Sequence, residues 1–273
     1  MRAFRWGGWL LGSLLAAPSY AFFENGFEDA FSAAPSATEA SRFLTQASFG
    51  PTLGEISRLQ GMTLPRWIDE QMALPASLHL PRIDQRMAQQ GMESVWGGER
   101  HEEWIRIAVT APDQLRQRVA FALSQILVVS EQSGALEGNP AAVASFYDVL
   151  VRNAFGNYRD LLEEVTLHPS MGQYLSMFRN RKTNQIGTIR PDENYAREIM
   201  QLFSVGLVQL NPDGTPILQG GQPLPTYDQD TIRGFAAVFT GWNLSTCTPT
   251  RPDWNSNTDS EGSINEYQNW WEW

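Results

Sequence analysis

The segment from Asp113 to Ser130 constrains the fold most, because its sequence, DQLRQRVAFALSQILVVS, predicts a helix that has to be buried. The C-terminal half of this segment is apolar nearly all round, a pattern typical of a helix covered on every side by other elements. Hydrophobic residues make up 42% of the 273-residue chain, which is enough for a real core. We therefore expect further helices to surround this segment.

Helical patterns recur on both sides of it, with capping residues before several of them and little strand signal. Residues 75–81 and 179–190 are predicted to be loops, and residues 207–225 to hold a short hairpin around Asn211–Gly214. The predicted fold class is all-α, a compact multi-helix single domain with long irregular loops. Its central helices are Asp113–Ser130 and Pro191–Gly206. The other expected helices cover 38–50, 52–59, 64–73, 102–109, 139–154, 157–168, 170–178 and 228–239.

The charge balance is acidic, with 20 Lys and Arg against 30 Asp and Glu. A nucleic-acid-binding protein usually presents a basic face, so we expect no nucleic-acid partner. With three histidines and the single Cys247, a zinc site made of protein ligands alone is not expected either. Cys247 cannot form an intrachain disulfide. The sequence identifies no cofactor, since it has no phosphate loop, dinucleotide fingerprint or G-x-S-x-G elbow.

Residues 1–21 have the pattern of a secretory signal peptide. Arg2 and Arg5 form its positive start, Trp6–Ala17 is apolar but short for a membrane span, and Ser19–Ala21 fits a cleavage site. Cleavage gives an exported protein without a transmembrane span, located in the periplasm, at the cell surface or in the medium. An uncleaved N-terminal anchor is the alternative interpretation.

The helix expected at Pro191–Gly206 carries the densest set of residues suited to chemistry. Glu193, Asn194, Arg197 and Glu198 fall on its polar side. Residues four apart are neighbours on a helix, so Glu193 should pair with Arg197 and Asn194 should lie beside Glu198. An ordinary solvated face explains this spacing. The alternative is a cleft in which Glu193 and Glu198 are catalytic and Asn194 and Arg197 bind the ligand. The pattern leaves both interpretations open.

The loop just before this helix, residues 179–190, is basic, although the chain as a whole is acidic. It carries four cations and no acid, and these cations could bind an anionic group such as a sulfate, a phosphate or a uronate, although from the sequence we favour the next interpretation. The alternative is that they neutralise Glu193 and Glu198. The four residues are Arg179, Arg181, Lys182 and Arg190.

Two histidines are considered as possible site residues. Glu164 and His168 are four residues apart and could reach one metal ion, but a histidine directly before Pro169 is more typical of a helix-terminal cap. We favour the cap and predict no metal ligands. His101 lies near the start of an expected helix and is interpreted as a surface residue.

Four segments of the chain resemble the bacterial domain of unknown function 1800 family. DENYAREIMQLFSVG is similar to its central motif, and LRQRVAFALSQILVVS, ASFYDVLVRNAFGNYRDLLEEVTLHPSMGQYL and YDQDTIRGFAAVFTGW resemble three further stretches in family order. The resemblance runs from about Thr38 to Trp242 and implies an exported, largely helical protein, without supplying a reaction. Ala236 and Ala237 stand near the place of a family arginine, whose role is therefore in doubt here. Family motif positions are held by Glu193, Asn194, Arg197, Glu198, His168, Asp230 and Trp242.

The resemblance also implies a missing part, because family members continue well past the T-G-W motif. Residues 22–37, rich in Ala, Ser and Phe, are expected to be a flexible lead-in, and residues 38–242 the helical domain. Residues 243–273 are expected to be an irregular, truncated tail. Its tryptophans either stack on sugars or belong to a core whose other half is absent; they are Trp254, Trp270, Trp271 and Trp273.

Two functions follow as hypotheses. The first is a binding or assembly role at the cell envelope, with an extracellular polysaccharide or an envelope protein as partner. The second is a hydrolase-like enzyme that uses Glu193 and Glu198, with or without a divalent metal ion.

Overall fold

The computed structural model describes residues 33–91, 97–134 and 136–242. This part of the chain holds eleven helices and one antiparallel pair of short strands, which confirms the all-α class. The predicted signal peptide, Cys247 and the four tail tryptophans lie outside it. The elements are α2 (Ala37–Ala47), α3 (Leu53–Leu59), α4 (Leu64–Ala73), α5 (His79–Gln90), α6 (Gly97–Thr110), α7 (Gln114–Ser124), α8 (Pro140–Arg152), α9 (Tyr158–Leu167), α10 (Pro169–Tyr174), α11 (Asn194–Gln201), β1 (Leu218–Gln219), β2 (Gln222–Pro223) and α12 (Gln229–Val238).

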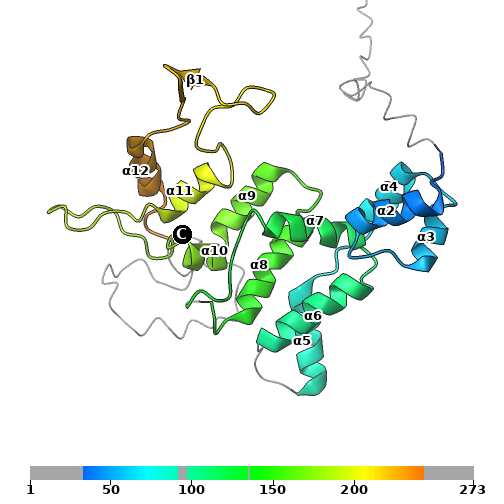
Figure 1. Ribbon diagram of the computed structural model, residues 1–273. Helices are drawn as coiled ribbons and strands as arrows, with labels where there is room; N and C mark the ends of the chain where they lie inside the picture. Colours follow the sequence, from blue (N-terminus) through cyan, green and yellow to red (C-terminus); the bar gives the residue numbers. More distant parts are fainter. Residues whose placement is uncertain (1–32, 92–96, 135, 243–273) are drawn as a thin grey trace, which may run out of the picture.

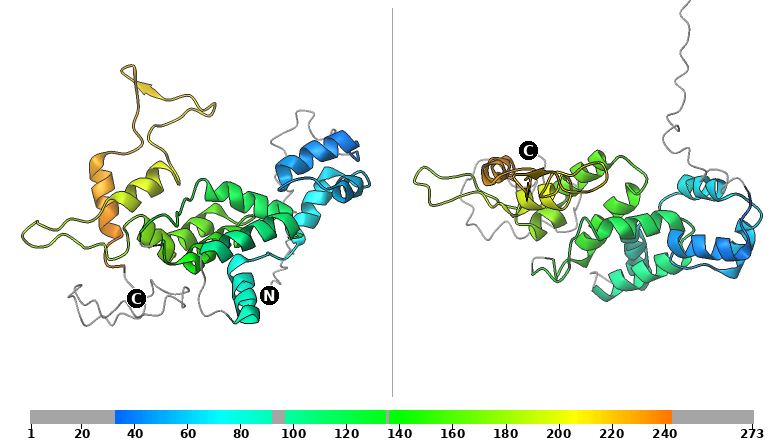
Figure 2. Two further views of the ribbon diagram at one scale, coloured as in Figure 1. Left: turned by 60° about the horizontal axis from the view of Figure 1, so that its bottom comes forward. Right: turned by 45° about the horizontal axis from the view of Figure 1, so that its top comes forward.

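Helix α8 is the centre of the molecule. It packs against α5, α6, α7, α9 and α10, and most of its residues are buried. The α2–α4 group lies at one end of the elongated body and the α11–α12 pair at the other (Figure 1). Two segments project from the α11–α12 end, the loop of residues 179–190 and the arm that carries β1 and β2 (Figure 2).

The helix expected at Asp113–Ser130 is shorter than predicted, and its C-terminal half is not buried all round. Helix α7 ends at Ser124, and the following turn is closed by a tighter bond, from the Ile126 N–H to the Leu123 carbonyl. Leu127 is buried, but Ile126 and Val128 are 47% and 41% exposed. The run ILVV explains the early end, because β-branched side chains lose rotamer freedom in a helix.

Helix α5 was missed, because Pro75 and Pro81 were interpreted as loop punctuation. In the structure α5 begins at His79, so Pro81 falls in its first turn. The N–H groups of a first turn have no intrahelical acceptor, so a proline there costs no hydrogen bond. The resulting helix buries Ile83 and Met87.

The other predicted elements are present, with shifts at their ends. Helices α3, α9 and α12 begin after the caps Thr52, Asn157 and Asp228. Helix α11 is shorter than its predicted span of residues 191–206, and it lies at one end of the body rather than at its centre (Figure 1). The strands of the hairpin flank Gly220 and Gly221, and the turn expected near Asn211 lies earlier in the same arm. In the described part of the chain no helix has both the length and the apolar character needed to cross a membrane.

Candidate functional site

The predicted ion pair on α11 is present and extends to a neighbouring helix. Glu193 lies at the N-terminus of α11, and its Oε2 is 2.7 Å from Nη2 of Arg197. Gln229 of α12 donates from Nε2 to the same oxygen (2.8 Å) and accepts from Arg197 Nη2 (3.0 Å). The hydrogen bonds from Gln229 and then from Arg197 lower the pKa of Glu193 below its usual range. Glu193 is therefore a paired carboxylate that links α11 to α12.

The other two residues predicted on this face do not join that group. Within the described residues, Arg197 pairs with Glu193 and not with Glu198, which is half-buried. Asn194 is exposed, and its backbone N–H donates to Asp192 Oδ1 at 2.8 Å. A cavity of about 720 Å³ lies between α11 and α12, lined by apolar residues such as Ile199 and Phe235. A second cavity of about 610 Å³ adjoins α3 and α4. None of the four predicted residues lines either cavity.

The basic loop is exposed apart from its root. Arg181, Lys182 and Arg190 are exposed, whereas Arg179 is half-buried with its guanidinium 5.0 Å from the centre of the Phe178 ring. Glu193 is neutralised by Arg197 of its own helix. This pairing favours a role for the loop cations other than neutralising Glu193.

His168 is a cap, as we favoured from the sequence. It ends α9, and its Nδ1 accepts a hydrogen bond from the Ser170 N–H (3.2 Å) at the start of α10. Glu164 is half exposed and lies 3.9 Å from an Arg152 nitrogen. Among residues 33–91, 97–134 and 136–242, no group of three His, Cys, Asp or Glu side chains is placed to hold a metal ion.

Two further family positions have structural contacts. Asp230 is exposed and pairs with Arg233 at 3.0 Å. Trp242 packs against the main core, and its carbonyl accepts a hydrogen bond from the Arg179 N–H (2.9 Å).

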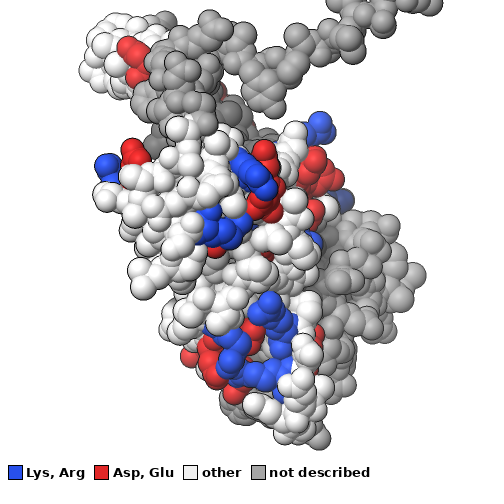
Figure 3. All heavy atoms as spheres, turned by 90° about the vertical axis from the view of Figure 1, so that its right-hand side faces the viewer, with Lys and Arg blue, Asp and Glu red and all other residues white. Residues whose placement is uncertain are grey.

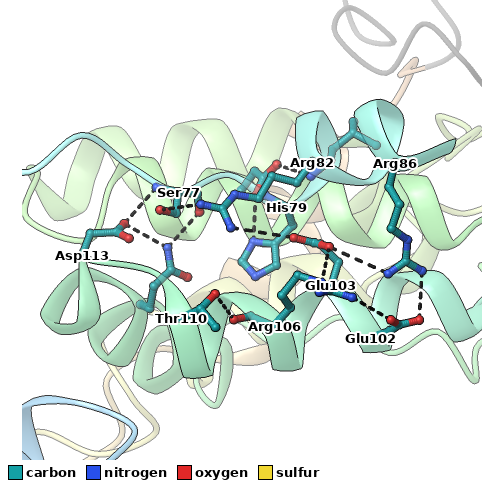
Figure 4. Close-up of polar contacts among 12 residues, drawn as sticks. Ser77, His79, Arg82, Arg86, Glu102, Glu103, Arg106, Thr110 and Asp113 are labelled. Carbon is teal, nitrogen blue, oxygen red and sulfur yellow. Dashed lines mark hydrogen bonds and ion pairs between the residues drawn. The ribbon is translucent and has the colours of Figure 1, made fainter. Parts of the chain in front are cut away.

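The sequence did not indicate a network of buried polar side chains between α5, α6, α7 and α8 (Figure 4). Asp148 of α8 accepts from the His79 N–H (2.6 Å), from the Leu80 N–H (2.9 Å) and from His79 Nδ1 (3.0 Å). It therefore caps α5, whose own N-cap residue, Leu78, offers no side-chain acceptor. The other ring nitrogen of His79, Nε2, is buried without a partner in the described residues.

Asp113 anchors the segment before α5 in the same way. Its side chain is fully buried, and Oδ2 accepts from the Ser77 N–H (2.9 Å) and from Gln117 Nε2 (3.1 Å). Gln117 also donates to the Ser77 carbonyl (2.9 Å). These bonds fix the chain between α4 and α5 against α7.

The outer side of this network is a set of charges on α5 and α6, which we call the arginine cluster: Arg82, Arg86 and Arg106 around Glu103, with Glu102 at the rim. Charged side chains of both signs surround a hollow in the lower half of the face shown in Figure 3, at the height of α5 and α6. Glu103 is only 3% exposed. The carboxylate of Glu103 lies 3.4 Å from Arg106, 3.9 Å from Arg82 and 4.0 Å from Arg86.

The N–H groups of the arginine cluster do not all have a hydrogen-bond acceptor. Arg86 and Arg106 each bond to Glu102, at 3.0 and 2.8 Å, but Nη1 of Arg86 is buried and makes no hydrogen bond within the described residues. The contacts of Arg82 and Arg86 with Glu103 are longer than hydrogen bonds. The four-residue spacing of Arg82 and Arg86 would have indicated a shared face, had α5 been predicted as a helix.

The comparisons with known proteins identify a family and no individual relative. A family model described as "Protein of unknown function (DUF1800)" matches residues 42–268. Neither the curated proteins nor the solved structures gave a match.

Proposed function

We propose that this chain, which belongs to the DUF1800 family of proteins of unknown function, is an exported binding protein of the cell envelope. The ligand that we propose is an acidic polysaccharide, bound at the arginine cluster. Export is supported by the signal-peptide pattern of residues 1–21.

The observation that carries this proposal is the unused hydrogen-bonding capacity of the cluster. Three guanidinium groups surround two carboxylates, and the buried Nη1 of Arg86 has no acceptor among the described residues. The side chains of Arg82 and Arg106 are 36% and 51% exposed, so a ligand oxygen can reach their guanidinium groups from solvent. Guanidinium groups bind carboxylate and sulfate oxygens through paired hydrogen bonds. Uronate or sulfate groups of a polysaccharide supply such oxygens.

The hydrolase hypothesis has less support. Hydrolysis of a glycosidic bond by two carboxyl groups requires one of them to stay protonated, through a raised pKa. The pKa of Glu193 is instead lowered by Gln229 and Arg197. The two described cavities do not include Glu193 or Glu198 in their lining. These features are better suited to binding than to acid catalysis.

The test is the affinity of the full chain for polygalacturonate, measured by titration calorimetry beside a neutral polysaccharide. Replacing Arg82 and Arg106 together by Gln should weaken uronate binding at least about tenfold, because charge-assisted hydrogen bonds are worth about 1.5–3 kcal/mol each. Arg233→Gln is the matched control, since Arg233 is an exposed, ion-paired arginine on α12.

Two results would contradict the proposal. One is equal binding of the acidic and the neutral polysaccharide. The other is an equal loss of affinity in the Arg233 control. Thermal unfolding of each variant separates lost binding from lost folding.

A further inference from the structure

The loop of residues 179–190 stands away from the body of the protein, between α10 and α11 (Figures 1 and 2). Its root is closed by Asn180, whose side chain accepts from the Asp192 N–H (2.7 Å) and donates to the Asp192 carbonyl (3.3 Å). Asn180 is buried and also donates to the Phe239 carbonyl (3.2 Å). The loop is thus a projecting segment on a fixed base.

An apolar side chain occupies the turn of this loop. Ile186 is 80% exposed and follows Asn184, which organises the turn. The Asn184 carbonyl accepts from the Gly187 N–H (3.1 Å), and Asn184 Oδ1 accepts from the Ile189 N–H (3.0 Å). Asn184 Nδ2 donates to Thr188 Oγ1 (2.7 Å). An ordered turn therefore holds Ile186 in water, from which transfer into an apolar phase would be favourable.

All charged side chains in the loop that carries Ile186 are positive. Lys182 and Arg190 flank it and are exposed. The loop holds four of the 20 basic residues of the chain and none of its 30 acidic residues. The rest of the chain is therefore strongly acidic. An anionic surface repels that remainder and attracts the loop, over a Debye length of about 8–10 Å at physiological salt.

We propose that this loop docks the protein on a bilayer that contains anionic phospholipid. Lys182 and Arg190 would lie at the phosphate groups, and Ile186 would enter the boundary between headgroups and acyl chains. Basic residues next to an exposed apolar residue are the combination that interfacial binding uses. A soluble polyanion would use the cations but would leave Ile186 in water. The exposed isoleucine therefore favours the bilayer over a dissolved acidic polymer.

The test is sedimentation of the full chain with vesicles of phosphatidylcholine, with and without phosphatidylglycerol. We expect binding only when phosphatidylglycerol is present, and loss of binding at high salt. Replacing Lys182 and Arg190 by Gln should weaken binding about fivefold per charge. Ile186→Ser should weaken it by several-fold, whereas the control Leu53→Ser should not, although Leu53 is 85% exposed on α3.

Three outcomes would overturn the inference. Equal binding to both kinds of vesicle would show that charge plays no role. An equal loss of vesicle binding in the Leu53→Ser control would show that the loop plays no specific role. Polygalacturonate binding that falls with Lys182 and Arg190 but not with Ile186, together with absent vesicle binding, would assign the loop to a soluble polyanion. The arginine cluster is not altered in these variants, so they test the loop separately from the polysaccharide site.

Discussion

His168 should make the stability of this protein sensitive to acid. Its imidazole is buried between α9 and α10, and the ring of Phe146 packs against it with 5.4 Å between the ring centres. Because Nδ1 accepts from the Ser170 N–H, the proton of the neutral ring lies on Nε2, which donates to Ser145 Oγ (3.1 Å). A second proton would have to bind at Nδ1 and would break the cap of α10.

Burial, with a smaller contribution from the charge of Arg152, lowers the pKa of His168 from 6.5 to about 3. The unfolded chain therefore binds this proton at a higher pH than the folded chain does. Stability due to the neutral ring is complete above pH 6.5 and is lost as the pH falls toward 3. At 1.36 kcal/mol for each pKa unit, the loss amounts to roughly 4–5 kcal/mol. That is a large part of the 5–15 kcal/mol that typically separates folded from unfolded domains, about the full stability of the weaker ones.

The assay is urea unfolding of the wild type and of His168→Asn at several pH values from 7 to 3.5. Asparagine is a good N-cap but does not ionise, so the variant should lose about 1–3 kcal/mol at neutral pH and depend less on acid. The difference between the two curves should shrink as the pH falls. His101→Asn is the control, because His101 is exposed and its ion pair with Glu131 (2.7 Å) lies at the surface, where such a pair is worth less than about 1 kcal/mol. Parallel curves for the wild type and His168→Asn would refute the reasoning.

Three further substitutions, the first with a control at a neighbouring residue, test the ion pairs and caps by urea unfolding. Glu103→Gln should cost about 3 kcal/mol, because it removes a buried charge from three arginines, whereas its exposed neighbour Glu102→Gln should cost less than about 1 kcal/mol. Asp148→Ala should cost about 2–4 kcal/mol, since three donors of α5 lose their acceptor, and a neutral result would mean that water replaces it. Glu193→Gln should change stability by less than about 1 kcal/mol; a larger loss would show that the α11–α12 link is structural.

The elements predicted correctly are those whose determinants lie close together in the sequence. The side chains of Thr52 and Asp228 each accept a hydrogen bond from an N–H three residues later. The capping residue and the helix that it caps therefore lie in one short stretch of sequence. Helix α5 is different, because its cap is Asp148, which is 69 residues from His79. No local pattern contains that information, and two prolines nearby pointed to a loop.

The same distinction holds for the candidate sites. The pair of Glu193 and Arg197 was predictable because helical geometry places residues four apart together. Gln229, which completes the contact by bonding to both residues, comes from another helix and could not be predicted. The arginine cluster combines α5 and α6 in the same way, so Glu103 and Arg82 look like ordinary surface residues in the sequence.

Asn180 closes the basic loop at its base. The two hydrogen bonds between the Asn180 side chain and the Asp192 backbone hold the ends of the loop together whatever lies between them. Insertions, deletions or substitutions in residues 181–191 should therefore leave the packing of α10, α11 and α12 unchanged. The length and charge of the loop can then change independently of the helices that carry it.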